Sequence, residues 1–182
     1  MRFIASFVGW SQTGKTTLLS QLIEAYTRRG YRVAAVKKTN HHVADDREGS
    51  DTELFHRSGS EQIALVGSDA ARLYRYDPLE ESELLELFPR AERLLSEGFY
   101  FRGHPCLEVL GPRSAAGGPK RPPEEVSAYV LSDLGRGSRE QDVRQPLQDS
   151  VPDFARTAEK PIFDSADIDS ILTFLEELWN EK

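Results

Sequence analysis

The chain has 182 residues, of which 38% are hydrophobic and 29% are charged. That length suffices for one sizeable hydrophobic core but not for two ordinary ones, so we expect a single domain over residues 1–182. The 30 acidic and 23 basic residues give a net charge of -7, which argues against a broad surface for nucleic acid or anionic membrane. Any anion that the chain binds therefore needs a local site.

The chain has one cysteine, Cys106, which excludes an intramolecular disulfide and fits a reducing compartment. It precedes a strand-like run, and we interpret it as a small, inert core residue. The apolar run over residues 3–8 is too short for a signal peptide or a membrane span, and no later run is long enough for either. We therefore expect a cytoplasmic protein.

The first elements in chain order predict a strand, a helix and a second strand. Residues 3–8 are continuously apolar, which is typical of a strand buried on both faces in a parallel sheet. Apolar residues at helical spacing predict a helix over 15–29, and a second strand follows over 31–36. This unit implies a parallel pair with a right-handed crossover. The polar stretch 37–49 predicts a long loop at the carboxyl edge of the sheet.

The rest of the chain alternates short predicted strands and helices. The predicted helices are 51–58, 79–88 and a closing amphipathic helix over 168–179. The predicted strands are 63–66, 72–76, a weakly patterned strand end within 94–99, 107–110, 126–131 and 161–164. Two segments poor in regular pattern, 111–125 and 135–160, are expected to be flexible loops. Together, these predicted strands and helices indicate an α/β fold with a mostly parallel central sheet flanked by helices.

The turn between the first predicted strand and helix fits the pattern G-x-x-x-x-G-K-[ST] of a phosphate-binding loop, or P-loop. Its glycines let successive N–H groups point inward as an anion nest, and the helix start adds partial positive charge. Lys15 would place a cation between the β- and γ-phosphates of a nucleoside triphosphate, and Thr16 would offer its hydroxyl to Mg²⁺. These two are also the candidate catalytic residues. The predicted nucleotide-binding residues of the turn are Gly9, Trp10, Ser11, Gln12, Thr13, Gly14, Lys15, Thr16 and Thr17.

The position of this motif favours a P-loop NTPase-like three-layer fold. The alternative is a lysine-containing turn that merely caps a helix. The match lies between a predicted buried strand and a predicted amphipathic helix, which is the arrangement that phosphate binding requires. We therefore predict a nucleotide site here.

Two acids are candidates for approaching Mg²⁺ together with Thr16. The first is Asp46, although Asp45 and Asp51 have similar claims and a solvated loop acid is the plain alternative. The second is Glu97, which follows a predicted strand at the edge where open α/β sheets place ligands. A turn-forming acid is the competing interpretation of Glu97.

Several motifs, in this order and spacing, resemble the molybdopterin-guanine dinucleotide biosynthesis protein B (MobB) family. They are residues 9–19, residues 36–42, the spaced Asp46-x2-Gly49-x-Asp51 and the run Glu97-Gly98-Phe99. Ser58-Gly59-Ser60, Ser132-Asp133 and Phe163-Asp164 also fit, so the resemblance spans nearly the whole chain.

The resemblance implies a homodimeric accessory protein that binds GTP and Mg²⁺ and hydrolyses GTP feebly. It would assist the guanylyltransferase that joins GMP to molybdopterin, and the pterin itself is a possible further ligand. No arginine finger or water-positioning glutamine is evident in the sequence, which agrees with slow hydrolysis. By analogy with P-loop GTPases, Asp133 would pair with N1 and N2 of guanine.

This chain departs from the family pattern at three places. After the second predicted strand the family has Lys-His-x-His-His, whereas this chain has Lys37-Lys38-Thr39-Asn40-His41 followed by His42. Ser50 stands where lysine is common, and the strand before Glu97 is interrupted by Arg90, Glu92 and Arg93. The departures concern the histidine loop and one strand, while the phosphate turn keeps the family pattern.

The histidine loop and Trp10 each allow more than one interpretation. His41 and His42 lack a further histidine or cysteine at zinc-ligand spacing. With Lys37 and Lys38 they would contact a phosphate or pterin anion, or form a solvated basic loop. Trp10 would pack on the nucleotide, on a partner subunit or on the flank of the turn.

Two other classes of function fit a single P-loop domain of this length. A small-molecule kinase needs an arginine-bearing lid, and Arg136 and Arg139 in the second long loop could supply one. The sequence has no recognisable acceptor-activating aspartate near the P-loop, and this absence weighs against a kinase. A module that binds nucleotide without turnover is the third hypothesis.

Overall fold

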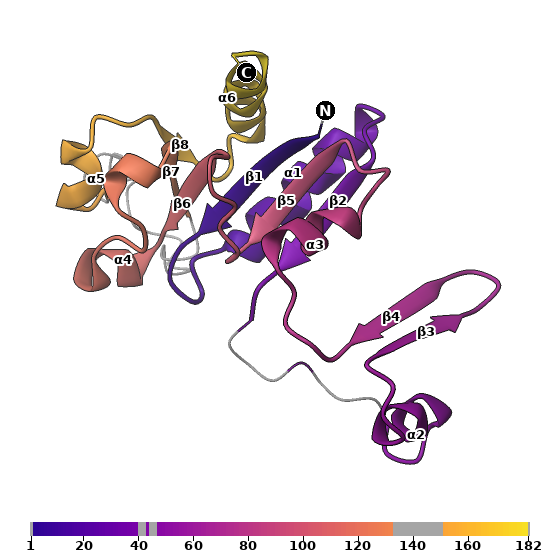
Figure 1. Ribbon diagram of the computed structural model, residues 1–182. Coiled ribbons are helices and arrows are strands. Elements are labelled where there is room, and N and C mark those ends of the chain that lie inside the picture. The colour runs from indigo at the N-terminus through magenta and orange to yellow at the C-terminus, as the bar shows by residue number, and fades with distance from the viewer. Residues whose placement is uncertain (1, 40–42, 44–46, 133–150, 182) are drawn as a thin grey trace, which may run out of the picture. The chain divides into compact units, whose positions relative to one another are not determined.

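The computed structural model describes residues 2–39, 43, 47–132 and 151–181 (Figure 1). The chain divides into two compact units, one formed by Met1–Lys38 and Arg90–Lys182 and the other by Thr39–Pro89. The smaller unit is therefore an insertion in the sequence of the larger one. Among the described residues, no helix combines the length and the apolar character needed to cross a bilayer.

The larger unit is built on a six-stranded sheet with the order β2-β5-β1-β6-β7-β8. All five neighbouring pairs are parallel, so the carboxyl ends of the strands meet at one edge. The strands are β1 (Phe3–Val8), β2 (Val33–Lys37), β5 (Arg93–Glu97), β6 (Cys106–Leu110), β7 (Ala128–Leu131) and β8 (Ile162–Asp164).

The predicted pairing of the first two strands is wrong, because β5 lies between β1 and β2. Leu95 of β5 is in register with Ala5 on one side and with Ala35 on the other. Leu94 and Leu95 are fully buried, and such a strand needs neighbours on both sides. β2 carries exposed residues and suits the edge of the sheet.

Helices cover both faces of this sheet. The helices α1 (Lys15–Arg28) and α6 (Ile168–Asn180) pack on one face through Leu22 and Leu172, against strand residues such as Phe7. Short α5 (Asp153–Thr157) packs on the opposite face, where Ala155 meets Tyr129 and Leu131 of β7. The predicted α/β fold with a mostly parallel central sheet is confirmed.

The segment 111–125, expected as a flexible loop, contains regular structure. It holds α4 (Pro112–Gly117) and the short 3-10 helix η1 (Pro123–Glu125). Pro112 suits the first turn of a helix, and the backbone N–H of Gly111 donates to the hydroxyl of buried Ser114 across 3.1 Å. Of the second expected loop, 135–160, residues 135–150 lie outside the described residues, and the prediction is wrong for the rest, because α5 occupies 153–157.

The strand β5 begins at Arg93, one of the charged residues that seemed to interrupt it. Arg93 is only 7% exposed. The guanidinium carbon lies 3.9 Å from the ring centre of Tyr31, 5.5 Å from that of Tyr26 and 5.7 Å from those of Phe3 and Trp179. Stacking on aromatic faces stabilises a buried guanidinium, so the charge belongs to the core.

The smaller unit contains two helices and a hairpin. These are α2 (Asp51–Arg57), β3 (Gln62–Val66), β4 (Ala71–Arg75) and α3 (Glu81–Glu86), with β3 and β4 antiparallel. Ser50, one of the departures from the family pattern, caps α2 by accepting a hydrogen bond from the N–H of Glu53 at 3.2 Å. All four elements were predicted with boundaries that differ by a few residues.

Candidate functional site

The turn between β1 and α1 has a backbone course that depends on its glycines. Gly9 has φ 144° and Gly14 has φ 83°, both outside the range that suits other residues. A Cβ on Gly9 would lie only 2.4 Å from the carbonyl oxygen of Val109 on β6. Gln12 also has a positive φ, 63°, a conformation that is concentrated at functional sites. The turn therefore holds a specific conformation against the carboxyl edge of the sheet.

The first turn of α1 leaves its backbone N–H groups without a side-chain cap. Gly14 occupies the N-cap position, and the first turn contains no acidic residue. By contrast, Ser50 caps α2, and Asp167 caps α6 by accepting from the N–H of Ser170 at 3.1 Å. Uncapped N–H donors and the helix dipole together favour an anion at this end of α1.

Lys15 lies back over the turn that precedes it. Its ammonium group donates to the carbonyl oxygen of Trp10 at 2.6 Å and to the hydroxyl of Thr13 at 3.3 Å. Partial burial lowers the pKa of Lys15, Glu97 opposes this, and the charges of Lys37 and Lys120 lower it further. One carboxylate and two further lysines thus act on the charge of the motif lysine.

Thr16, Glu97 and Lys37 form a polar cluster at the carboxyl edge of the sheet. The hydroxyl of Thr16 donates to Oε2 of Glu97 at 2.8 Å, and the ammonium of Lys37 lies 3.3 Å from Oε1. Lys37 also lies 3.4 Å from the Thr16 hydroxyl. The Glu97 side chain is 14% exposed. A hydroxyl and a carboxylate side by side are ligands that Mg²⁺ prefers.

The cluster brings together two of the three residues predicted to approach Mg²⁺. Lys37 was predicted only as a possible contact of a phosphate or pterin anion, not as a partner of Thr16 and Glu97. Its place follows from strand register, because Lys37 ends β2 directly beside Glu97 at the end of β5. Recognising it from the sequence would have required knowing that these two strands are neighbours.

Trp10 packs on the last residue of α4 and on the segment that follows it. Its indole N–H donates to the carbonyl oxygen of Gly118 at 2.9 Å, and a Cβ on Gly117 would lie 2.7 Å from its ring. The ammonium of Lys120 lies 3.5 Å from a ring centre of Trp10. We call residues 117–121 the strap. Of the interpretations offered for Trp10, packing on the flank of the turn is the one that these contacts support.

Several predicted residues cannot be placed in this cluster. Asp46 and Asp133 lie outside the described residues, as do Asp45, His41 and His42. Asp51 begins α2 in the smaller unit. Within the described part of the chain, no three His, Cys, Asp or Glu side chains group as a metal site.

Of the nucleotide-binding residues named above, Ser11, Gln12 and Thr17 have exposed side chains on or just after the turn.

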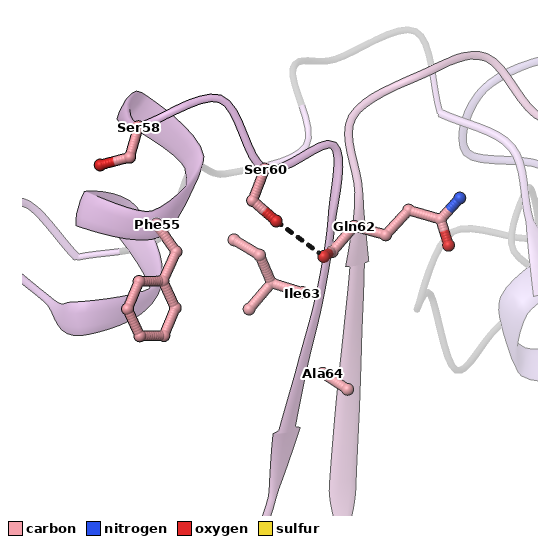
Figure 2. Close-up of a pocket in the computed structure, with 6 residues that line it drawn as sticks. All are labelled: Phe55, Ser58, Ser60, Gln62, Ile63 and Ala64. Carbon is pink, nitrogen blue, oxygen red and sulfur yellow. Dashed lines mark hydrogen bonds between the residues drawn. The ribbon is translucent and has the colours of Figure 1, made fainter.

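A separate pocket of about 500 Å³ lies in the smaller unit (Figure 2). Six residues from α2 to β3 line it: Phe55, Ser58, Ser60, Gln62, Ile63 and Ala64. The Ser60 hydroxyl donates to the Gln62 carbonyl oxygen at 2.9 Å. None of the six lining residues is ionisable, so the lining of this pocket offers no acid or base. The P-loop is the candidate functional site.

The parallel sheet, the P-loop and the uncapped α1 together define a P-loop NTPase-like fold. Solved structures share it. The crystal structure of Bacillus subtilis MobB is 21% identical with a TM-score of 0.64, covering 94% of this chain and 96% of that one. The hydrogenase maturation factor HypB from Archaeoglobus fulgidus is 13% identical with a TM-score of 0.53, covering 96% of this chain and 88% of that one.

Sequence comparison assigns the family. The family model described as molybdopterin guanine dinucleotide synthesis protein B matches residues 4–131. The molybdopterin-guanine dinucleotide biosynthesis adapter protein of Haemophilus influenzae is 30% identical over 133 residues, which cover 71% of this chain and 72% of that protein. The adapter protein of Escherichia coli is 32% identical over 102 residues, which cover 53% of this chain and 58% of that protein. The chain belongs to the molybdopterin guanine dinucleotide synthesis protein B (MobB) family.

Proposed function

We propose that this protein is a GTP-binding adapter in molybdopterin-guanine dinucleotide biosynthesis. It would hold GTP beside the guanylyltransferase that joins GMP to molybdopterin. Family membership and the similarity to adapter proteins of this pathway support the biosynthetic role. The observation that carries nucleotide binding is the turn after β1, where glycine backbone, Lys15 and the uncapped α1 meet.

Magnesium fits the oxygen atoms beside this turn. The Thr16 hydroxyl and the Glu97 carboxylate lie 2.8 Å apart, and Asp46 is the third proposed contributor. These residues would hold Mg²⁺, which would supply positive charge to neutralise the phosphates. Lys15 would hold the β- and γ-phosphates, and the first N–H groups of α1 would complete the cradle.

Slow hydrolysis is part of the proposal. Glu97 is the described acid nearest to Thr16, and both of its oxygens are engaged, one by Thr16 and one by Lys37. A carboxylate held in this way is poorly placed to accept a proton from an attacking water. The site is therefore better suited to holding GTP than to consuming it.

Calorimetric titration of the full-length protein with GTP, GDP and ATP, with and without Mg²⁺, tests nucleotide binding. Lys15→Ala should abolish measurable GTP binding. Lys160→Ala, which removes the same charge two residues before β8, should leave it intact. If Lys15→Ala binds GTP as well as the unaltered protein does, the proposed site is wrong.

Product analysis separates the competing functions. Slow release of phosphate from GTP supports the proposal, whereas transfer of the phosphoryl group to a small acceptor would show a kinase. Binding with no turnover at all would show a pure binding module. Sedimentation of the protein with and without the guanylyltransferase tests the adapter role and the proposed homodimer in one measurement.

Guanine selectivity is assigned to Asp133. A carboxylate accepts hydrogen bonds from N1 and N2 of guanine, which adenine cannot supply. Asp133→Asn should weaken GTP binding and strengthen binding of xanthosine triphosphate, since xanthine carries an oxygen in place of the amino group at C2. Equal loss for both nucleotides would remove Asp133 from the base site.

A further inference from the structure

The strap, residues 117–121, is tied to the P-loop at one end and to the sheet at the other. At the first end, Gly118 accepts the Trp10 indole N–H and Gly117 lies against the Trp10 ring. At the second end, Glu108 of β6 accepts the backbone N–H of Lys120 at 2.7 Å and that of Arg121 at 3.4 Å. The backbone at Lys120 is therefore fixed relative to the turn.

Glu108 is an unusual residue for the middle of a parallel sheet. Its side chain is fully buried, and burial raises its pKa, although the two backbone N–H donors and Lys120 oppose that rise. A buried carboxylate costs folding free energy unless donors satisfy it. Here the donors belong to the strap, so the carboxylate fixes the position of Lys120.

The side chain of Lys120 is exposed and lies on the P-loop side of the strap. Its ammonium is 3.5 Å from a ring centre of Trp10, the residue after Gly9. The ammonium of Lys15 donates to the Trp10 carbonyl oxygen at 2.6 Å, and that of Lys37 lies 3.4 Å from the Thr16 hydroxyl. Glu97 forms its ion pair with Lys37, at 3.3 Å. The turn therefore gathers excess positive charge in a chain whose net charge is -7.

We propose that Lys120 is a second phosphate-binding lysine, which the strap supplies to the P-loop from the same chain. This inference rests on the proposed nucleotide site. A cation–π contact at an exposed position is weaker than a charge-assisted hydrogen bond to phosphate. The flexible stem of lysine lets its ammonium leave the Trp10 ring for a phosphate oxygen without moving the strap. Trp10 holds the lysine beside the turn until the anion arrives.

Three variants of the full-length protein test the role by titration with GTP and GDP in Mg²⁺. Lys120→Met keeps the apolar stem on Trp10 and removes the charge, and it should weaken GTP binding about tenfold or more. Lys120→Arg should retain most of the affinity. Lys160→Ala is the matched loss of one lysine charge and should bind as the unaltered protein does. The salt dependence of the dissociation constant should also decrease in Lys120→Met alone.

A positioning variant completes the test. Glu108→Gln leaves one acceptor oxygen for two backbone donors, and it should weaken GTP binding less than Lys120→Met does. In the Lys120→Met background, Glu108→Gln should weaken GTP binding little further, because the ammonium group that Glu108 positions is already absent.

The outcomes separate this inference from the proposed function. If the unaltered protein fails to bind GTP, the proposed function falls. If the protein binds GTP through Lys15, and Lys120→Met matches Lys160→Ala in affinity and salt dependence, only the role of Lys120 is overturned. Thermal unfolding of each variant checks that the exposed substitution leaves the fold intact.

Discussion

The hydroxyl of Thr16 donates a hydrogen bond to the carboxylate of Glu97 across 2.8 Å, although 81 positions separate them in the chain. Thr16 is the second residue of α1, and Glu97 is the last residue of β5. Parallel pairing of β1 with β5 brings them together, because the turn after β1 starts at the edge where β5 ends. The contact links the phosphate motif to the neighbouring strand.

Glu97→Gln should reduce the contribution of Mg²⁺ to GTP binding. The amide keeps the shape of the side chain but loses the charge that attracts the metal. We expect Mg²⁺ to strengthen GTP binding about tenfold less than in the unaltered protein, in line with changes to groups around bound metals. Metal-free GTP binding should stay equal or improve, since a negative charge is removed.

Isothermal titration with and without Mg²⁺ measures both quantities. Glu177→Gln, on the exposed side of α6, is the matched control. An undiminished Mg²⁺ effect in Glu97→Gln would exclude this carboxylate from the metal site.

Gly9→Ala should destabilise the fold as well as the site. The new methyl group would lie 2.4 Å from the Val109 carbonyl oxygen, at φ 144°. Backbone strain and overpacking together cost about 2–4 kcal/mol in the free energy of unfolding. Gly103→Ala is the control, because Gly103 has φ 73° but open space around it, so only strain of about 1 kcal/mol is expected. Urea denaturation distinguishes them, and equal losses would contradict the close approach of β6 to the turn.

Arg93→Ala should lower the free energy of unfolding by about 2–4 kcal/mol, because the stem and the guanidinium fill space among four rings. Arg93→Lys keeps the charge but loses the planar stacking on Tyr31, and should cost about 1 kcal/mol. Arg102→Ala, at an exposed position, is the reference. If Arg93→Ala is no less stable than Arg102→Ala, the aromatic contacts contribute nothing. GTP affinity should stay unchanged, since Arg93 lies at the opposite end of β5 from Glu97.

Stability should fall as the pH rises above about 9. Burial raises the pKa of Cys106 from 9.0 to about 12, and burial likewise raises the pKa of Tyr26 from 10.0 to about 12. Below pH 9.0, the ordinary pKa of the thiol, the folded and the unfolded chain both keep the thiol proton, so the contribution of Cys106 to stability is fully present. Above it the unfolded chain loses the proton and the folded chain keeps it, which favours unfolding. The free energy of unfolding continues to fall until the pH reaches about 12, the pKa of Cys106 in the folded chain.

Urea denaturation at a series of pH values checks this sign. Between pH 9.0 and 10.0, the ordinary values of the two groups, Cys106 should dominate the decline. Cys106→Ala should make the free energy of unfolding decline less steeply in that interval. A single thiol contributes at most about 1.4 kcal/mol per pH unit to this slope. A slope that is identical in the variant would contradict a buried, protonated thiol.

The sequence predicted the elements whose apolar pattern is continuous. β1 was predicted with its observed bounds, and α1 and α6 to within one residue, because a buried strand and an amphipathic helix each repeat a simple local pattern. β5 was underestimated because Arg93 looked polar. Its burial depends on rings from four segments of the chain, and that arrangement is absent from any local window.

The candidate site shows the same division between local and distant information. The P-loop could be predicted from its local motif, and Glu97 was placed at the end of a weakly patterned strand, which is β5. The position of β5 beside β2 could not be predicted from the sequence, so the pairing of Lys37 with Glu97 was missed, although Lys37 was named as a possible contact of an anion. The strap was taken for a flexible loop because glycine and proline dominate it, yet its glycines allow the close packing on Trp10. Asp46 and Asp133 stay predictions.

The two tryptophans of this chain stand at the two ends of β1. Trp10 follows its last residue by two positions, and Trp179 packs edge-on against Phe3, its first residue, with ring centres 5.6 Å apart. The chain thus carries two intrinsic fluorophores that report on different events. With Trp179 replaced by phenylalanine, emission follows the phosphate turn alone. With Trp10 replaced, it follows the release of α6 from the sheet, so ligand binding and unfolding can be recorded separately without an added dye.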